Sequence, residues 1–405
     1  MPRYARQHRN HLFVWLGLVL FLTALLAACS EEATTPEPTE PRVPDLTAGM
    51  WNAFSGNNET ECSDGSEYEY YVYPGTENKL VIDFQGGGAC WDDGTCSLPS
   101  KQPNDGGVYN SVIFGEPAAQ GIYDKAEEDN PTKDWYHAFV SYCTADIHLG
   151  DSTQTYMNSD GTERTVQHKG QVNAQAVLDW VYEEFEAPET ILMTGCSAGA
   201  YGSIAYMPQV RKQYPNSDIY QLGDSGAGVA PQMFFEGEDG TSRWNAQSVL
   251  STLIPELDLS GGLTPSFLTD IYALAGEQNQ NGIVSQYNSA FDNIQILFYA
   301  LQQGATLPLS PEAAQQAAQE WTAGLNASLA GLNESTDNFY SYTSLLDNDD
   351  DPQNGTEHCI ITKPDLYEYE LNGVPFVSWV DDLVNGRTDD LASVAPSTPG
   401  MTALK

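Results

Sequence analysis

Short apolar runs separated by longer mixed stretches dominate the central part of the chain. Three runs are rich in β-branched or aromatic residues, and glycine or polar residues follow each of them: 79–84, 136–142 and 190–194. Runs of this length and composition are typical of buried strands. The pattern therefore predicts at least three strands in the interior of a sheet.

The stretch between the second and third runs has the spacing of an amphipathic helix. Its apolar residues recur at helical intervals: Ala174, Val177, Leu178, Val181 and Phe185. Such residues form one apolar stripe along a helix. Strand, helix and strand in this order predict a parallel crossover unit.

Later segments continue the alternation less regularly. We expect a helix over 198–210, strands over 218–222, 283–291 and 339–345, and a helix over 313–329 that begins at Ser310-Pro311. The predicted fold class is α/β, with a mostly parallel central sheet flanked by helices. A single domain with a helical insertion within 240–335 accommodates these elements.

The N-terminus has the pattern of an export signal. Arg3, Arg6 and Arg9 precede an apolar run over 12–28 that is short for a membrane span. The run ends in Leu-Ala-Ala before Cys29, which resembles the lipobox of bacterial lipoproteins. We therefore expect a signal peptide over 1–28, a lipid on Cys29, a polar tether over 29–44 and a folded domain over 45–405. The expected location is a bacterial membrane, at the cell surface or the periplasmic face.

The charge balance restricts the partners. The full chain has 16 basic and 56 acidic residues and a net charge of −40, and removal of the three signal-peptide arginines brings this to −43. Such a surface argues against nucleic acid as a partner. It also repels polyanions at low ionic strength, and it suggests a saline habitat, where salt screens the self-repulsion.

Six cysteines remain after Cys29: Cys62, Cys90, Cys96, Cys143, Cys196 and Cys359. An even number in an exported protein predicts disulfides, although six thiols allow 15 connectivities. Spacing predicts only one of the bonds, between Cys90 and Cys96, because these two cysteines bracket a short turn. No spacing predicts a zinc site, and the acidic run 347–351 lacks the glycine of a calcium loop, so we expect a solvated loop there.

The segment 195–199, Gly-Cys-Ser-Ala-Gly, matches the nucleophile elbow of the α/β-hydrolase fold. Small residues flank the serine because the strand-to-helix turn is tight, and here a predicted strand precedes the motif and a predicted helix follows it. Ser197 is therefore the candidate nucleophile. The rival, Ser225 in Gly-Asp-Ser-Gly-Ala, lacks the last glycine of the motif.

A serine nucleophile needs a histidine base and a carboxylate. In this fold the chain order is serine, acid, histidine, and only His358 follows Ser197. His137 lies in a strand run, and His148 and His168 precede the nucleophile.

The candidate acid is Asp292. It lies between the strand 283–291 and a helical pattern, which is the position of a triad acid but equally that of an ordinary helix N-cap. Spacing alone leaves these two interpretations equal, with Asp224 and Asp337 in reserve.

Glycines follow the first predicted strand at Gly86, Gly87 and Gly88. They permit close approach of the backbone and predict part of an oxyanion hole, with the Ala198 N–H as the partner donor. A flexible turn is the alternative.

Several motifs in one order resemble the pectin acetylesterase and Notum family, in particular its bacterial lipoprotein members. They are 84–90 (FQGGGAC) with Cys96, 142–146 (YCTAD) with His148 and 150–151, 168–170 (HKG) with Asn173, 195–199, 224–226 (DSG) and 291–295 (FDNIQ). The resemblance spans 51–384 and is more specific than any single motif.

The resemblance implies a triad of Ser197, Asp292 and His358, and an oxyanion hole from Gly87, Gly88 and Ala198. It also implies disulfides between Cys90 and Cys96 and between Cys62 and Cys143, whereas a bond between Cys196 and Cys359 has no support from spacing.

We thus expect a serine ester hydrolase that removes O-acyl groups, first of all acetyl, from a polysaccharide through an acyl-enzyme, without metal or organic cofactor. The charge leaves neutral acetylated glycans, lipid esters and polyesters open as substrates. The alternative is an inactive, surface-anchored glycan-binding lipoprotein with the same fold.

Overall fold

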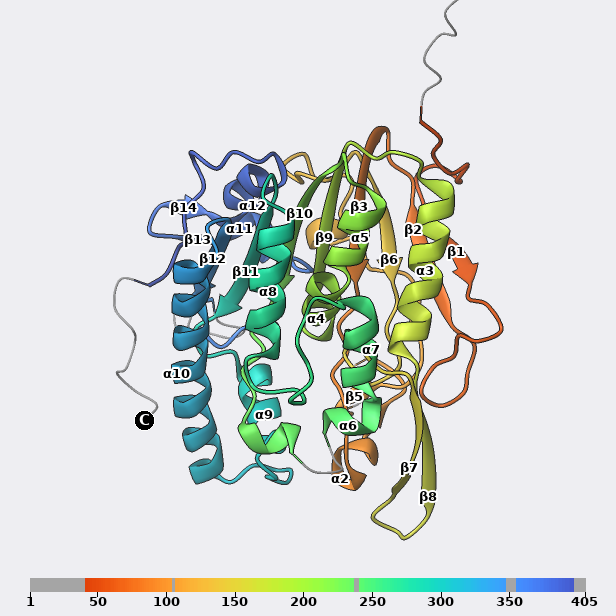
Figure 1. The fold of residues 1–405 in the computed structure, drawn as a ribbon, viewed down its shortest axis with the longest axis vertical. Coiled ribbons are helices and arrows are strands. Elements are labelled where there is room, and N and C mark those ends of the chain that lie inside the picture. The colour runs from red at the N-terminus through yellow and green to blue at the C-terminus, as the bar shows by residue number, and fades with distance from the viewer. Residues whose placement is uncertain (1–40, 104–105, 237–239, 347–354, 397–405) are drawn as a thin grey trace, which may run out of the picture. The chain divides into compact units, whose positions relative to one another are not determined.

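A central sheet of eight strands organises the described part of the chain (Figure 1). The structure is a computed structural model that describes residues 41–103, 106–236, 240–346 and 355–396. The spatial order is β1 (Asn52–Ser55), β2 (Glu69–Tyr73), β6 (Trp135–Val140), β3 (Glu77–Phe84), β9 (Thr190–Cys196), β10 (Asp218–Asp224), β11 (Ile283–Ser289) and β12 (Phe339–Ser344). From β6 to β12 neighbouring strands are parallel, whereas β2 is antiparallel to both of its neighbours, β1 and β6. The predicted α/β class is confirmed.

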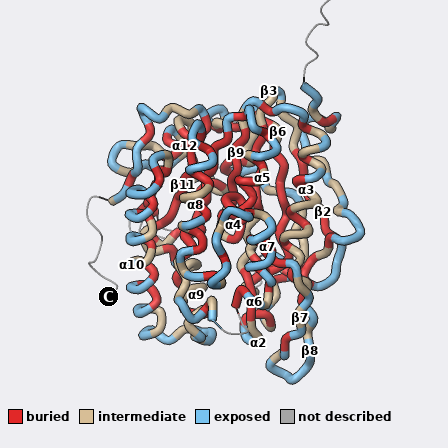
Figure 2. Tube along the Cα trace, in the orientation of Figure 1, coloured by how far each residue is buried: buried red, intermediate tan, exposed pale blue. Residues whose placement is uncertain are grey.

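Helices cover both faces of this sheet. One layer consists of α3 (Gly170–Glu184), α4 (Ala198–Ala205), α5 (Met207–Gln213), α8 (Phe267–Gln278) and α10 (Pro311–Ser335). On the other face lie α11 (Asp365–Glu368) and α12 (Phe376–Val384). Along β3, Leu80 and Ile82 pack in the first layer and Val81 in the second, because successive strand side chains point to opposite faces. Figure 2 shows the resulting buried interior running along the strands.

The predicted strands occur where the apolar runs placed them, but the predicted helix over 198–210 is divided. Its two parts are α4 and α5, and Pro208 lies in the first turn of α5. Proline has no N–H for a continuous helix and its ring displaces the carbonyl four residues earlier. It is favourable in a first turn, so a new helix begins there.

A polar hairpin lies between β6 and α3, where the sequence pattern predicts no strand. It consists of β7 (Ser152–Met157) and β8 (Glu163–His168), which pair antiparallel. Only Tyr156, Val166 and His168 are buried in it. Few apolar side chains alternate along these strands, so the period-two signal was absent.

The remaining elements are short or lie within residues 240–335. They are α2 (Asp93–Cys96), β4 (Pro99–Ser100), β5 (Tyr109–Asn110), η1 (Gly121–Tyr123), η2 (Gln232–Phe235), α6 (Thr241–Trp244), α7 (Ala246–Leu253), α9 (Asn293–Gln302), β13 (Glu370–Leu371) and β14 (Val374–Pro375). The Ser310 side chain caps α10, where a helix start was expected.

The predicted signal peptide, Cys29 and most of the tether lie outside the described residues, as does the acidic run 347–351. At Arg42 the backbone carbonyl accepts an N–H from Glu186 at 3.1 Å, so the chain contacts the domain from there on. Among the described residues, no helix has the length and apolarity that a membrane crossing requires.

Candidate active site

The carboxyl ends of the parallel strands meet at one edge of the sheet, where sites in open α/β sheets form. The glycines 86–88 follow β3, Ser197 follows β9, and Asp292 lies between β11 and α9. His358 lies on the connection between β12 and α11. Four segments that are distant in the sequence therefore converge on one place.

Ser197 occupies a strained turn between β9 and α4. Its φ and ψ are 56° and −121°, a region that non-glycine residues rarely adopt. A Cβ on Gly199 would lie 1.7 Å from the carbonyl oxygen of Phe84, and one on Gly195 would lie 2.5 Å from the same atom. Only glycine fits at both positions, so the spacing of the motif follows from the contact between this turn and β3.

The imidazole of His358 contacts the carboxylate of Asp292. Nδ1 of His358 lies 2.9 Å from Oδ2 and 3.0 Å from Oδ1 of Asp292, whose side chain is 0 % exposed. A carboxylate only accepts hydrogen bonds, so Nδ1 carries the proton and Nε2 is left to accept one. This is the tautomer that a serine base requires.

Asp292 is also the N-cap of α9. Its Oδ1 accepts N–H groups from Ile294 at 3.1 Å and from Gln295 at 2.9 Å. The structure thus shows the helix cap, and the same carboxylate has the contact with His358 that the triad interpretation requires. The cap N–H groups hold Oδ1, and both carboxylate oxygens lie within 3.0 Å of Nδ1 of His358.

Burial and the surrounding charges oppose each other at His358. Burial lowers the pKa of its imidazole, but the negative charge and hydrogen bond of Asp292, followed by the charge of Asp224, outweigh it and raise the pKa above its usual value. Lys363 acts in the opposite direction. The net shift favours the protonated form that arises when a base takes a proton.

Two cavities meet at Ser197 and His358. The smaller has a volume of about 70 Å³ and is mainly apolar, with walls that include Trp91, Tyr201, Phe234, Phe298 and Trp321. The larger is an open groove of about 520 Å³ whose walls include Gly87, Tyr109, Asn110, Tyr123 and Leu307. Ser197 thus lies at the junction of a small apolar pocket and a wider groove.

The glycine loop lies directly beside the nucleophile. A Cβ on Gly86 would be 2.5 Å from the carbonyl oxygen of Cys196, and Gly88 has a φ of 73°. Tyr142 Oη donates to the Gly88 carbonyl oxygen at 2.9 Å. Gly88 and Ala198 line the small cavity together with Ser197, and Gly87 lines the groove.

The other histidines of the described domain are buried elsewhere. His137 Nε2 lies 3.1 Å from a carboxylate oxygen of Asp83, and His148 Nε2 lies 2.9 Å from a backbone carbonyl oxygen. His168 contacts Tyr156 Oη and a second carbonyl oxygen. All three have structural partners.

The alternative serine and acids do not contact His358 as Asp292 does, although Ser225 also lines the small cavity. Ser225 bonds to Asp224 and to the backbone of Cys359. Asp224 is buried at the end of β10. Asp337 is exposed just before β12, at the opposite edge of the sheet from the site.

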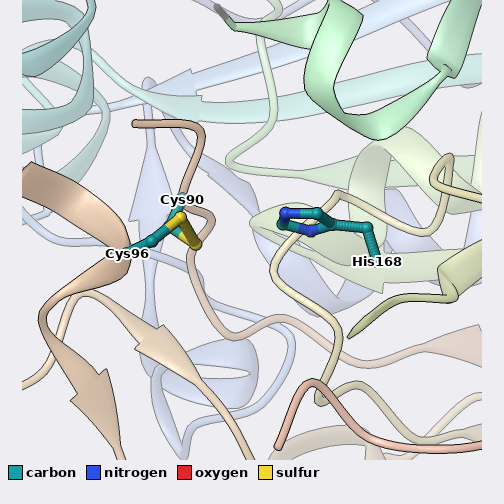
Figure 3. A group of neighbouring side chains, drawn as sticks. All are labelled: Cys90, Cys96 and His168. Atoms are coloured by element: carbon teal, nitrogen blue, oxygen red, sulfur yellow. A yellow bond between two sulfur atoms is a disulfide. The ribbon is translucent and has the colours of Figure 1, made fainter. Parts of the chain in front are cut away.

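Three disulfides join the six cysteines of the described domain. Cys62–Cys143 and Cys90–Cys96 agree with the pairs that the resemblance implied. Figure 3 shows Cys90 and Cys96 bonded to each other beside His168, so their thiolates are not free to hold a metal.

The third disulfide, Cys196–Cys359, was missed by spacing because 163 residues separate its cysteines. A signal for it existed, since one cysteine precedes the candidate nucleophile and the other follows the candidate base. A ring nitrogen of His358 and both sulfur atoms lie within 4.8 Å of one another.

The sheet topology is that of the α/β-hydrolase fold. A serine, a histidine and an aspartate converge at the carboxyl ends of its strands. The family model described as Pectinacetylesterase matches residues 52–296, which is more than half of the chain. The chain therefore belongs to the pectinacetylesterase family. The match includes Ser197 and Asp292 and ends before His358.

Two plant proteins are similar in sequence. Pectin acetylesterase 11 of Arabidopsis thaliana is 24% identical over 249 residues, which are 58% of this chain and 60% of that protein. Pectin acetylesterase 5 of the same plant is 24% identical over 217 residues, 52% of this chain and 49% of that protein. The chain thus spans about half to three-fifths of the length of these relatives.

Two crystal forms of the Wnt deacylase Notum from Drosophila share the fold. Both have a TM-score of 0.53, with identities of 16% and 15%. The matches cover 86% and 87% of this chain and 96% and 98% of the Notum chains. At this identity the likeness shows a common α/β-hydrolase architecture.

Proposed function

We propose that this protein is a serine carboxylic-ester hydrolase that removes small O-acyl groups from a polysaccharide. The observation that carries the proposal is the hydrogen bond between His358 Nδ1 and the buried Asp292, beside a cavity that His358 shares with Ser197. The names of the plant relatives support the reaction class.

The reaction proceeds through an acyl-enzyme. The Oγ of Ser197 attacks the acyl carbonyl carbon while Nε2 of His358 takes the serine proton. The backbone N–H groups of Gly87, Gly88 and Ala198 are the proposed donors to the developing oxyanion. His358 then gives the proton to the leaving alcohol, and a water molecule, deprotonated by His358, releases the acid and restores Ser197.

The two cavities suggest how the substrate is oriented. A pocket of about 70 Å³ with aromatic walls suits a short acyl group such as acetyl, whereas a sugar hydroxyl would lose hydrogen bonds to water there. The groove of about 520 Å³ is wide enough for the alcohol portion. We therefore place the acyl group in the small cavity and the polysaccharide along the groove.

The net charge of the chain and the side chains that line the two cavities favour an uncharged glycan. Among the described residues that line either cavity, none is a lysine or an arginine. The full chain has a net charge of −40, so a polyanion approaches against a repulsive field. Neutral acetylated glycans, or pectin whose carboxyl groups are methyl-esterified, are thus the proposed substrate class.

We further propose that the enzyme is exported and held on a bacterial membrane by a lipid on Cys29. This rests on the N-terminal sequence alone. Expression in a bacterial host should place the full chain in the membrane fraction, and Cys29→Ser should move it to the soluble fraction. Equal membrane retention of both forms would contradict the anchor.

A fluorophosphonate probe tests the hydrolase directly. We expect labelling of the full chain at Ser197, located by peptide mass spectrometry, together with turnover of p-nitrophenyl acetate. Ser197→Ala should abolish both, while the control Ser203→Ala, a buried serine of α4, keeps the label. A folded protein that binds glycans but shows neither label nor turnover would instead support the inactive glycan-binding lipoprotein.

A further inference from the structure

Asp224, which the mechanism above does not use, ends strand β10 and is 0 % exposed. Its Oδ2 accepts backbone N–H groups from Ile360 at 2.8 Å and Ile361 at 2.9 Å. Its Oδ1 accepts the hydroxyl of Ser225 at 3.0 Å. A buried carboxylate with three donors from two segments is a fixed point of the structure.

The same residue holds the nucleophile through its backbone. The carbonyl oxygen of Asp224 accepts the N–H of Ser197 at 2.7 Å. In the parallel pairing of β9 with β10, Asp224 is the register partner of Cys196, which precedes the nucleophile. One residue thus bonds to the turn of Ser197 and to the segment just after His358.

Two further links join these segments. Ser225 Oγ accepts the N–H of Cys359 at 3.0 Å, and Cys359 forms the disulfide with Cys196. Ser225 and Cys359 have φ values of 57° and 61°, in the left-handed region that non-glycine residues seldom adopt. Residues in such conformations persist where surrounding contacts over-determine them.

We propose that Asp224 is a positioning residue for the reaction: through Ser225, Ile360 and Ile361 it fixes the segment of His358 against Ser197, and its charge stabilises the imidazolium. This inference rests on the proposed function. It assigns to Asp224 a role distinct from that of Asp292, whose carboxylate accepts the hydrogen bond from the imidazole.

The proposed effect of the Asp224 charge on the imidazolium follows from the charged groups around His358. Asp292, Asp224 and Lys363 are the charges that act on its pKa, and both carboxylates raise it. Burial raises the pKa of Asp224 itself to about 6, although the N–H groups of Ile361 and Ile360 oppose the rise. Asp224 is therefore mainly charged at neutral pH, where removal of its charge lowers the pKa of His358.

Two substitutions separate position from charge. Asp224→Asn keeps an acceptor for the two backbone N–H groups and lets the amide donate to Ser225, so geometry is preserved while charge is lost. We expect the acid limb of the kcat/KM profile for p-nitrophenyl acetate to move to lower pH. Asp224→Ala removes the acceptors as well, and kcat should fall on the order of 10²-fold with a smaller change in KM.

Asp146→Asn is the matched control. Asp146 is equally buried and accepts a backbone N–H from Gly170 and a hydroxyl from Thr144, but it is not among the groups that shift the pKa of His358. We expect Asp146→Asn to lower the melting temperature about as much as Asp224→Asn does. Unlike Asp224→Asn, it should leave the acid limb of the kcat/KM profile where it is. If the wild-type enzyme is active and Asp224→Asn leaves the limb unmoved, or Asp146→Asn moves it equally, Asp224 has only a structural role. An inactive wild type would instead refute the proposed function.

Discussion

Asp292 and His358 are 66 residues apart in the sequence, yet a carboxylate oxygen of Asp292 lies 2.9 Å from Nδ1 of His358. The same carboxylate caps α9, so its position is determined by a helix terminus rather than by the imidazole. A substitution that preserves the cap can therefore remove the charge without removing the support.

Asp292→Asn should lower kcat on the order of 10⁴-fold while the protein stays folded. Asparagine is as good an N-cap as aspartate, but its amide does not enforce the Nδ1–H tautomer. Steady-state turnover of p-nitrophenyl acetate measures the loss, and circular dichroism checks the fold. A larger loss in Asp224→Asn than in Asp292→Asn would mean that the two acids have exchanged roles.

As the pH is lowered, this enzyme should lose activity at a higher pH than an enzyme whose histidine base has an unshifted pKa. The base must be neutral to accept the serine proton, and its pKa is raised because Asp292 and Asp224 outweigh the effect of burial. The acid limb of kcat/KM should therefore lie above the usual histidine value of about 6.5. A pH–rate profile checks this, and a limb below that value would contradict the sign.

Removal of the Cys196–Cys359 disulfide should destabilise the protein more than removal of Cys90–Cys96. The first closes a loop of 163 residues and the second a loop of 6. If disulfides act by restricting the unfolded chain, the losses are about 5 and about 2 kcal/mol. Urea unfolding of the two double alanine variants measures them, and equal losses would show that loop closure does not dominate.

The turnover of acetylated polygalacturonate should depend on its carboxyl groups. We expect the methyl-esterified polymer to be deacetylated faster than the de-esterified one at low salt, because its backbone is the same but its charge is largely absent. Added NaCl should reduce the difference by screening. Thr362→Lys, which places a cation on the groove wall, should favour the de-esterified polymer. Equal rates at low salt would rule out the proposed preference.

The melting temperature should rise between low and molar NaCl. A net charge of −40 destabilises the compact state through self-repulsion, and the screening length falls from about 30 Å at 0.01 M to about 3 Å at 1 M. Calorimetry in NaCl and, at matched osmolality, in sucrose separates screening from exclusion effects. A melting temperature that stays constant or falls in NaCl would count against a saline adaptation.

Much of the candidate site could be predicted from the sequence because its signals are local. The small residues around Ser197 are demanded by one turn, and only one histidine follows it in the order that this fold uses. The buried strands β3, β6 and β9 were equally visible, since each is a short apolar run with clear boundaries. The polar hairpin of β7 and β8 had no such pattern.

Other features required the tertiary structure. Asp292 remained ambiguous between a helix cap and a triad acid because both need a carboxylate at the same place. Only the tertiary structure brings His358 to the carboxylate that caps α9. The sequence likewise does not predict the bond between Cys196 and Cys359 or the contacts of Asp224.

The sequence by itself determined the six parallel strands of the sheet, the elbow at Ser197 and the candidate base, because propensity, turn sterics and chain order act over a few residues. The tertiary structure alone decided how the segment of His358 is held against the turn of Ser197. That geometry depends on contacts between β9, β10 and a segment more than 130 residues further along the chain, as in the bonds of Asp224 to Ile360 and Ile361. Such contacts leave no periodic trace, because each is a single pair brought together by the packing of the whole sheet.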